Sequence, residues 1–198
     1  MRPVAAVIAA LYFLSSPADA QQGVAFLVVD LGSSSPVAAE RGAALDTPIP
    51  PGSVVKIATI AAALESGTLG ARTTIPCTRE ASVAGRRLTC THPDLQRPLT
   101  PAEALAHSCN VFAATVAARL PRQALDGALA SLGLPPTDPR KAVASAALGV
   151  DGILVPPRKL LDAVARIANR AAVRRSRARS ANGGTSPPPV LQASSRRR

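Results

Sequence analysis

Aromatic residues are scarce in this chain. Its 198 residues include no Trp, one Tyr and three Phe, which together make up 2% of the sequence. Proteins that bind single-stranded nucleic acid stack bases on aromatic side chains, so this composition excludes most binding platforms of that kind. A wholly disordered polyelectrolyte is excluded as well, because 47% of the residues are hydrophobic. The length fits one domain, or one domain and a tail.

Acidic residues are also few, since 12 Asp and Glu stand against 23 Lys and Arg, for a net charge of +11. Residues 170–198 contain eight Arg and no acid, whereas residues 21–169 contain 14 basic and 11 acidic residues. We therefore expect a nearly balanced domain over 21–169, followed over 170–198 by a disordered basic tail. The tail either has no role or contacts anionic lipids or polymers at the cell surface.

Long hydrophobic runs are missing after the first twenty residues. Within these, Arg2 precedes the apolar stretch Val4–Leu14, and Ala18-Asp19-Ala20 forms a small-x-small cleavage site. The stretch is shorter than the roughly 20 residues that span a bilayer. We expect residues 1–20 to be a secretory signal peptide, with an uncleaved membrane anchor as the alternative. The domain is then periplasmic or extracellular, and nucleic acid is not an expected partner.

Only three cysteines are present. Cys77 and Cys90 enclose a polar loop, and in an oxidising compartment we expect them to form a disulfide that leaves Cys109 over. Two alternatives are unpaired thiols that pack as small hydrophobic residues and a zinc site. Zinc ligands would include the three cysteines with His92 and His107, but the close CxxC or HxxxH pair typical of zinc sites is missing. The sequence predicts no metal and no cofactor.

Hydrophobic patterning and capping signals predict a mixture of strands and helices. Val24–Val29 is a β-branched run typical of a strand, and Pro36–Ala39 is predicted to return beside it. Thr100, Pro101 and Glu103 form a capping box that predicts a helix ending near His107. Other helices are predicted over Val54–Ser66, Val111–Leu120, Gln123–Leu132 and Arg158–Asn169, with a loop over 68–99.

The segment Gly52-Ser53-Val54-Val55-Lys56 carries the first candidate site. Ser53 is predicted at a helix N-terminus, and Lys56 follows three residues later on the same helical face. A lysine whose pKa is lowered by burial can accept the serine proton, and the helix dipole favours the developing alkoxide. The alternative is an N-cap serine followed by a solvated lysine.

A second candidate motif is Ser108-Cys109-Asn110, which places a hydroxyl and an amide two residues apart at a helix end. Ser108 can relay a proton between Lys56 and a leaving group, and Asn110 can hold Lys56 or a substrate carbonyl. Taken singly, these two residues are also compatible with ordinary helix termination.

Together the two motifs resemble those of the penicillin-binding protein transpeptidase family, the serine acyl-transferases related to serine β-lactamases. The resemblance covers about residues 23–169. It implies an α/β (α+β) fold of the β-lactamase/transpeptidase type, with helices packed on an antiparallel sheet. It also implies that Ser53 is the acylated nucleophile, Lys56 its base, and Ser108 and Asn110 the proton relay and the substrate-holding amide. The implied ligand is a peptidoglycan stem peptide ending in D-alanyl-D-alanine, or a β-lactam.

The third motif of that family, Lys-Thr-Gly, does not occur after Asn169. Residues 182–186 keep a Gly-Thr pair but lack the preceding cation. We therefore expect a partial domain without its last strands, truncated or shifted in reading frame near Arg170. Three functions remain open: acyl transfer by a transpeptidase, carboxypeptidase or β-lactamase; a non-catalytic sensor of β-lactam or peptidoglycan; and an inactive fragment.

Overall fold

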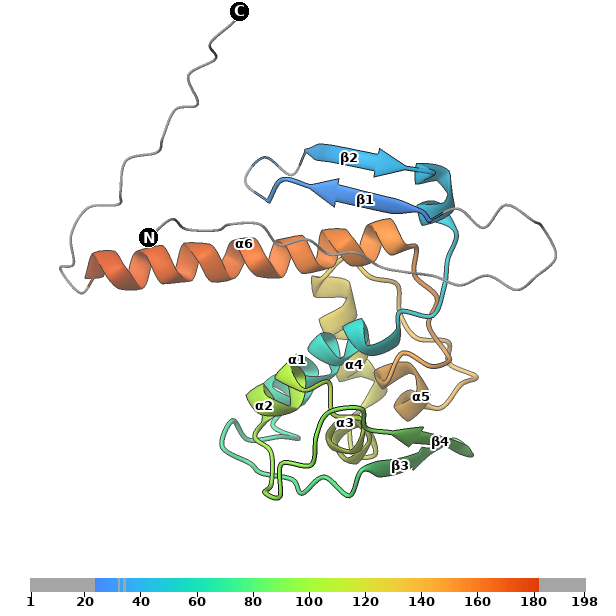
Figure 1. Ribbon diagram of the computed structural model, residues 1–198. Coiled ribbons are helices and arrows are strands. Elements are labelled where there is room, and N and C mark those ends of the chain that lie inside the picture. Colours follow the sequence, from blue (N-terminus) through green and yellow to red (C-terminus); the bar gives the residue numbers. More distant parts are fainter. Residues whose placement is uncertain (1–23, 32, 34, 182–198) are drawn as a thin grey trace, which may run out of the picture.

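Helices are the main regular structure of the described residues, and the strands there form two separate hairpins (Figure 1). The computed structural model describes residues 24–31, 33 and 35–181, so the predicted signal peptide lies outside the described residues. The elements are β1 (Phe26–Val29), β2 (Pro36–Glu40), the 3-10 helices η1 (Gly42–Asp46) and η2 (Gly52–Val55), α1 (Lys56–Glu65), β3 (Glu80–Val83), β4 (Arg86–Thr89), α2 (Pro101–Ala106), α3 (Asn110–Ala117), α4 (Arg122–Ser131), α5 (Val143–Ala147) and α6 (Pro157–Ala181).

The first hairpin confirms the predicted strand and its returning partner. β1 pairs antiparallel with β2, with Phe26 opposite Glu40 and Val28 opposite Ala38. The residues of β1 are half-buried, whereas every residue of β2 is exposed. This hairpin lies on one side of α6, and helices α1 to α5 lie on the other (Figure 1). An apolar pocket between β1 and α6 is lined in part by Phe26, Leu160 and Val164.

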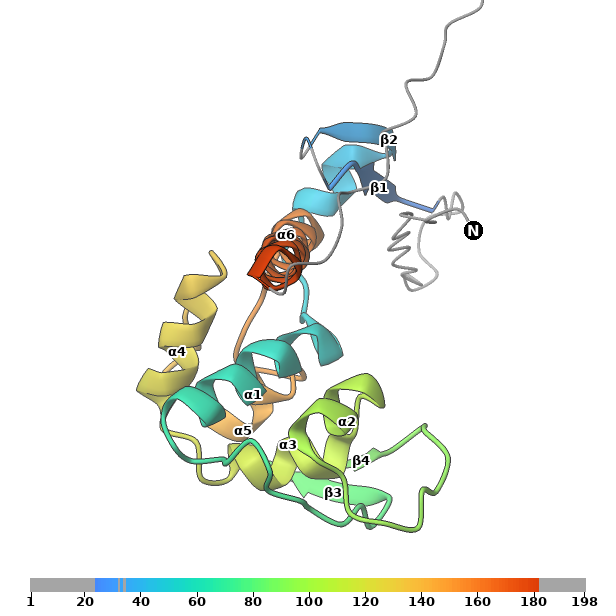
Figure 2. The ribbon, with the colours of Figure 1, turned by 90° about the vertical axis from the view of Figure 1, so that its left-hand side faces the viewer.

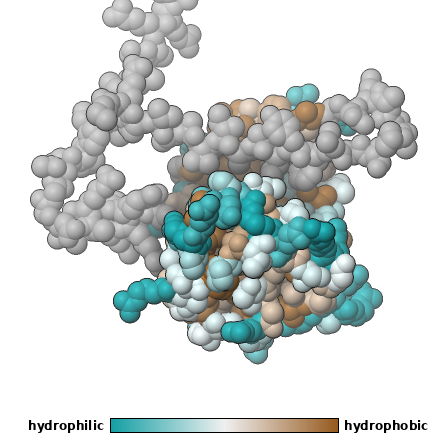
Figure 3. Space-filling model, turned by 60° about the horizontal axis from the view of Figure 1, so that its bottom comes forward, coloured by the Kyte–Doolittle hydropathy of each residue, from teal (hydrophilic) through white to brown (hydrophobic). Residues whose placement is uncertain are grey.

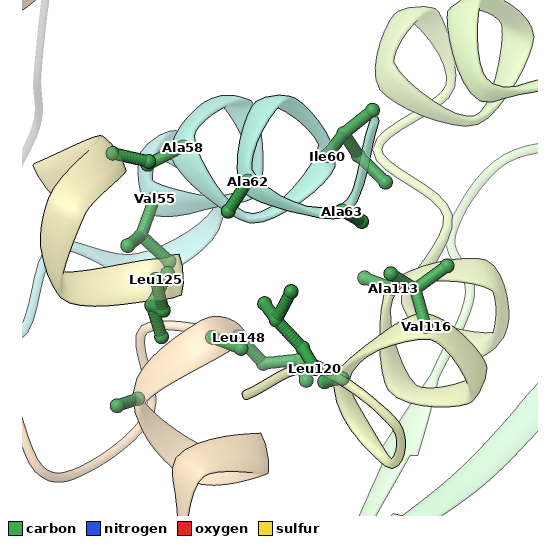
Figure 4. Close-up of a cluster of buried hydrophobic side chains, with 14 of the residues drawn as sticks. Val55, Ala58, Ile60, Ala62, Ala63, Ala113, Val116, Leu120, Leu125 and Leu148 are labelled. Carbon is green, nitrogen blue, oxygen red and sulfur yellow. The ribbon is translucent and has the colours of Figure 1, made fainter. Parts of the chain in front are cut away.

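The main core surrounds α1, which packs against α4 and α3 (Figure 2). Val55 and Ala63 are almost fully buried and meet Leu125 of α4 and Val116 of α3 in one cluster (Figure 4). Burying a Val or Leu side chain contributes about 1.5–3 kcal/mol. The strong burial of α1 therefore holds its N-terminal end, where Lys56 lies, in a defined position.

The predicted capping box starts α2. The Thr100 hydroxyl accepts a hydrogen bond from the Glu103 backbone N–H at 3.4 Å, and the Glu103 carboxylate accepts one from the Thr100 N–H at 2.9 Å. Reciprocal bonds of this kind satisfy two backbone donors that a helix start otherwise leaves free. The cap fixes the register of α2, which ends directly before the second motif.

The second hairpin lies within residues 68–99, which were predicted to be a loop. β3 pairs antiparallel with β4 across a two-residue turn in which Ala84 and Gly85 both have positive φ, 48° and 76°. Such turns favour Asn-Gly or Gly-Gly, and Ala at the first position gives no sequence signal. The hairpin packs on α3 at the end of the molecule shown in Figure 3, where hydrophilic and hydrophobic residues are interspersed on the surface.

The helices differ from the prediction in two places. α5 was not predicted, because five residues are too short for a periodic pattern. α6 does not stop at Asn169 but continues to Ala181, into the segment that was assigned to a disordered tail. Ala and Arg have high helix propensity, and no Gly or Pro occurs between Pro157 and Gly183. Residues 182–198 lie outside the described part. Within that part, none of the helices is both long and apolar enough to cross a membrane.

Candidate active site

Ser53 lies in the short helix η2, directly before α1, and its side chain is exposed. Gly52 precedes it with φ +57°, a left-handed conformation that glycine adopts without steric cost. The Gly52 N–H donates to the carbonyl of Gly149 at 3.1 Å. This bond ties the turn that carries Ser53 to the segment after α5.

Gly149 is a residue of the site that sequence reasoning did not single out for this role. An ideal Cβ on Gly149 would lie 2.1 Å from the carbonyl oxygen of Gly52, and Gly149 itself has φ +70°. Only glycine therefore fits, both because of the space and because of the backbone conformation. Gly149 and Gly52 are 97 positions apart along the chain, so no local sequence pattern indicates their contact.

Lys56 joins the first motif to the second. Its Nζ donates to the Ser108 carbonyl at 2.8 Å, to the Ser108 Oγ at 3.3 Å and to the Asn110 Oδ1 at 2.5 Å. The residue is only 2% exposed. Burial lowers the pKa of the Lys56 ammonium below its ordinary value of 10.5, and the nearby thiols of Cys90 and Cys109 act in the opposite direction. The alternative of a solvated lysine is therefore wrong for this structure.

A second hydrogen bond fixes the amide of Asn110. Its Nδ2 donates to the carbonyl of Thr89, the last residue of β4, at 2.6 Å. With the nitrogen held there, the oxygen of the same amide faces Lys56. The β3–β4 hairpin therefore positions a residue of the site. This role could not be predicted, because the hairpin itself was not predicted.

Ser108 has a strained backbone, with φ 50°. It follows the end of α2, where its N–H donates to the Leu105 carbonyl at 3.1 Å and the next N–H, that of Cys109, donates to the Ala104 carbonyl at 2.9 Å. These two bonds make a Schellman motif, whose left-handed position is usually Gly. A serine at this position costs about 1–2 kcal/mol relative to a relaxed backbone. A strained residue of this kind points to a functional constraint.

The structure thus brings three of the four predicted residues into direct contact, namely Lys56, Ser108 and Asn110. Ser53 differs, because among the described residues none forms a hydrogen bond with its hydroxyl. Its backbone carbonyl accepts a hydrogen bond from the Lys56 N–H. Ser53 lies three residues before Lys56 in the chain, and its side chain is exposed.

The three cysteines are free in the structure, and the predicted disulfide between Cys77 and Cys90 is not formed there. The Sγ atoms of Cys77 and Cys90 are 3.6 Å apart. Burial raises the pKa of the Cys109 thiol to about 12. Cys109 is the middle residue of the second motif, so these thiols adjoin the Ser108 and Asn110 site.

Comparison with protein families accounts for this combination of motifs. The model for the penicillin binding protein transpeptidase domain matches residues 16–174, which is most of the chain. The chain belongs to this family. A comparison with curated protein sequences found no significant match.

Solved structures of penicillin-binding proteins share its fold. A chain described as part of a peptidoglycan synthase complex is 26% identical with a TM-score of 0.54, over 64% of this chain and 26% of that one. Penicillin-binding protein A from M. tuberculosis, solved as an imipenem acyl-enzyme complex, is 23% identical with a TM-score of 0.53, over 64% and 34%.

The transpeptidase domain of penicillin-binding protein 3 from Burkholderia pseudomallei is 19% identical with a TM-score of 0.58, over 73% of this chain and 49% of that one. The matched part of this chain thus spans between a quarter and a half of these solved proteins. The predicted fold class, a partial transpeptidase-type fold of helices and antiparallel strands, is confirmed.

Proposed function

We propose that this transpeptidase-family domain binds penicillin-like and D-alanyl-D-alanine-like compounds by forming an acyl ester on Ser53. The observation that carries the proposal is the set of contacts made by Lys56. A buried lysine reaches the hydroxyl and the amide of a motif 52 and 54 residues away. Burial also lowers the pKa of Lys56, which favours its neutral, proton-accepting form.

In the proposed reaction, the Ser53 Oγ attacks the carbonyl carbon of the scissile amide while its proton passes to neutral Lys56. Lys56 and the Ser108 hydroxyl then deliver that proton to the leaving nitrogen as the C–N bond breaks. The result is an acyl ester on Ser53 and a free amine, or an opened ring in a β-lactam. An amine or a water molecule then takes the acyl group and restores Ser53.

The proposal extends to place and partners. We infer that the domain acts outside the cytoplasm on a peptidoglycan stem peptide, with residues 1–20 serving as the export signal. The charge of the eight Arg in residues 170–198 would attract anionic lipids or polymers. The family membership and the composition of these segments support this inference.

The experiment is labelling with a fluorescent penicillin. The wild-type chain should carry the label covalently after denaturing electrophoresis, and Ser53→Ala should lose it, because the attacking oxygen is gone. Ser66→Ala is the matched control, since Ser66 is an exposed serine at the other end of α1. No label on folded wild-type protein, or equal labelling of Ser53→Ala, would contradict the proposal.

A second function, sensing without turnover, is favoured by one observation. The sequence contains no Lys-Thr-Gly, whose backbone and side chains in this family complete the oxyanion hole and meet the substrate carboxylate. Loss of one oxyanion donor costs about 2.7–4 kcal/mol in the transition state, so both acylation and deacylation would be slow. Label that forms slowly and stays for hours would support the sensor, and label that clears within minutes would support an enzyme.

A further inference from the structure

Three thiols and an imidazole converge beside the second motif. We call this group the Cys3His cluster; its members are Cys77, Cys90, His92 and Cys109. One ligand atom from each residue lies within 4.8 Å of the other three. Three of the four residues are buried, and Cys77 is half-buried. Sequence reasoning set a zinc site aside because it searched for closely spaced ligand pairs, whereas the fold supplies the proximity here.

The spacing of the cluster matches tetrahedral coordination. With Zn–S bonds of about 2.3 Å and a Zn–N bond of about 2.0–2.1 Å, two sulfurs lie about 3.8 Å apart and a sulfur and a nitrogen about 3.6 Å apart. The measured Sγ–Sγ distances are 3.6 Å for Cys77–Cys90, 3.7 Å for Cys90–Cys109 and 3.5 Å for Cys109–Cys77, and the Cys77 Sγ–His92 Nε2 distance is 3.6 Å.

The imidazole of His92 directs its Nε2 toward the cluster and its Nδ1 toward the carbonyl of Pro93. Its Nδ1 lies 2.8 Å from the carbonyl oxygen of Pro93 and 3.3 Å from the Nη1 of Arg79. The contact with the carbonyl is the shorter one, and a carbonyl only accepts, so we assign the hydrogen to Nδ1. Nε2 therefore presents its lone pair toward the Cys77 sulfur. Hydrogen bonds from the second ring nitrogen to a backbone carbonyl are a regular feature of zinc-binding histidines.

Hydrogen bonds with Arg79 also stabilise the loop that carries Cys90 and His92. Arg79 donates to the carbonyl of Cys90 at 2.9 Å and to the carbonyl of His92. The Cys90 N–H in turn donates to the Arg79 carbonyl at 2.8 Å. On the opposite side of the cluster, the Phe112 N–H at the start of α3 donates to the Cys109 sulfur at 3.4 Å. Hydrogen bonds thus hold three of the four ligand residues, Cys90, His92 and Cys109, in place.

We propose that the Cys3His cluster is a structural zinc site that holds the second motif of the active site in place. Cys109 lies between Ser108 and Asn110, so a metal bond to its sulfur would fix the backbone of both neighbours. On binding, the three thiols release three protons to solvent and Zn²⁺ gains three Zn–S bonds and one Zn–N bond. The ion with three thiolates carries one negative charge, which the nearby guanidinium of Arg79 partly offsets.

The alternatives fit the geometry less well. A disulfide would join two of the three cysteines, but their nearly equal separations single out no pair. His107, the other histidine considered from the sequence, is not one of the residues whose ligand atoms lie within 4.8 Å of one another, and its ring centroid lies 5.6 Å from that of His92. It therefore provides a matched control for His92.

The test measures metal on the full chain. Protein equilibrated with Zn²⁺ under reducing conditions and freed of excess ion by gel filtration should contain one zinc per chain by mass spectrometry. Co²⁺ in its place should give the absorption of a tetrahedral cobalt thiolate. Cys77→Ser and His92→Ala should each lose most of the bound metal, whereas His107→Ala should keep it.

The consequence for the active site is measured separately. Removal of zinc with a chelator should lower the thermal midpoint and slow penicillin labelling on the order of tenfold or more, because Ser108 and Asn110 lose their fixed position. The metal measurement stands even if no labelling occurs at all, so failure of the proposed function is distinguishable. Wild-type protein that takes up no zinc, full zinc content in His92→Ala, or a Cys77–Cys90 disulfide in the isolated protein would overturn the proposal.

Discussion

Ser108 combines a strained backbone with a side chain that faces the base. Its φ of 50° occupies the position at the end of α2 where glycine is usual, and its hydroxyl lies 3.3 Å from the Nζ of Lys56. Glycine would relieve the strain but has no hydroxyl. The fold therefore accepts a cost in stability at this residue in exchange for a polar group beside Lys56.

Replacement of Ser108 should separate stability from function. Ser108→Gly should raise the free energy of unfolding by about 1 kcal/mol, which is about 2–4 °C in the thermal midpoint for a chain of this size. Penicillin labelling of the same variant should slow by about 10²-fold or more, because the proton relay is lost. Calorimetry and labelling kinetics measure the two effects.

Ser108→Ala is the control for the backbone. It lacks the hydroxyl as well, so its labelling should slow equally, but it keeps the cost of the left-handed conformation and should gain no stability. A Ser108→Gly variant that is no more stable than Ser108→Ala would contradict the explanation by strain.

At the scale of elements, the turn of Ser53 depends on a close approach between two backbones. The N–H of Gly52 donates to the carbonyl of Gly149, and the space at Gly149 leaves no room for a side chain. Ile49 and Val155 form a pair of backbone hydrogen bonds nearby, at 3.1 and 2.8 Å. The segment after α5 thus holds the turn that carries Ser53 in position.

Gly149→Ala should disturb this support. The new Cβ would overlap the Gly52 carbonyl, so either the turn moves or the protein unfolds, and we expect a loss of at least about 2 kcal/mol in stability. Gly127→Ala is the matched change, because Gly127 lies in α4 with no atom within 4 Å of an added Cβ. It should gain about 0.5–1 kcal/mol from helix propensity. Chemical denaturation of both variants tests the contrast, and equal stabilities would refute it.

Helices and strands could be predicted where residues close together in the sequence carry the signal. The Thr100–Glu103 capping box and the β-branched run of β1 act within a few residues, and both elements form as expected. The β3–β4 hairpin was missed because Ala84 adopts a left-handed turn that its side chain does not favour. The first two motifs could be found by their spacing, but Gly149 and the Cys3His cluster depend on contacts between distant segments, which no local pattern encodes.

At the scale of the whole molecule, the described residues include a well-packed helical core and a hairpin that is only partly buried. α1, α3 and α4 share a core of almost fully buried side chains. The β1–β2 hairpin instead rests on α6 through half-buried residues, and its second strand is exposed throughout. A two-stranded sheet by itself is only marginally stable in water.

Hydrogen exchange should therefore be faster in the β1–β2 hairpin than in the helical core. Backbone amides of β1 and β2 should exchange through local opening, well before those of α1 and α4, which should require global unfolding. Mass spectrometry of exchanged and digested protein resolves these segments. Protection of the β1–β2 amides equal to that of α1 would show that the hairpin is as firmly held as the core, contrary to this expectation.

The hydrogen bonds of Lys56 also determine the direction in which a proton can move. An ammonium group has three hydrogens, and three oxygen acceptors from Ser108 and Asn110 receive them. When Lys56 becomes neutral it keeps two hydrogens and gains a lone pair, so one acceptor loses its donor. The Ser108 hydroxyl is the only acceptor of the three that can respond by donating instead. Loss of one proton from Lys56 thus reverses the polarity of its bond to Ser108 and leaves that hydroxyl oxygen able to accept from elsewhere in the site.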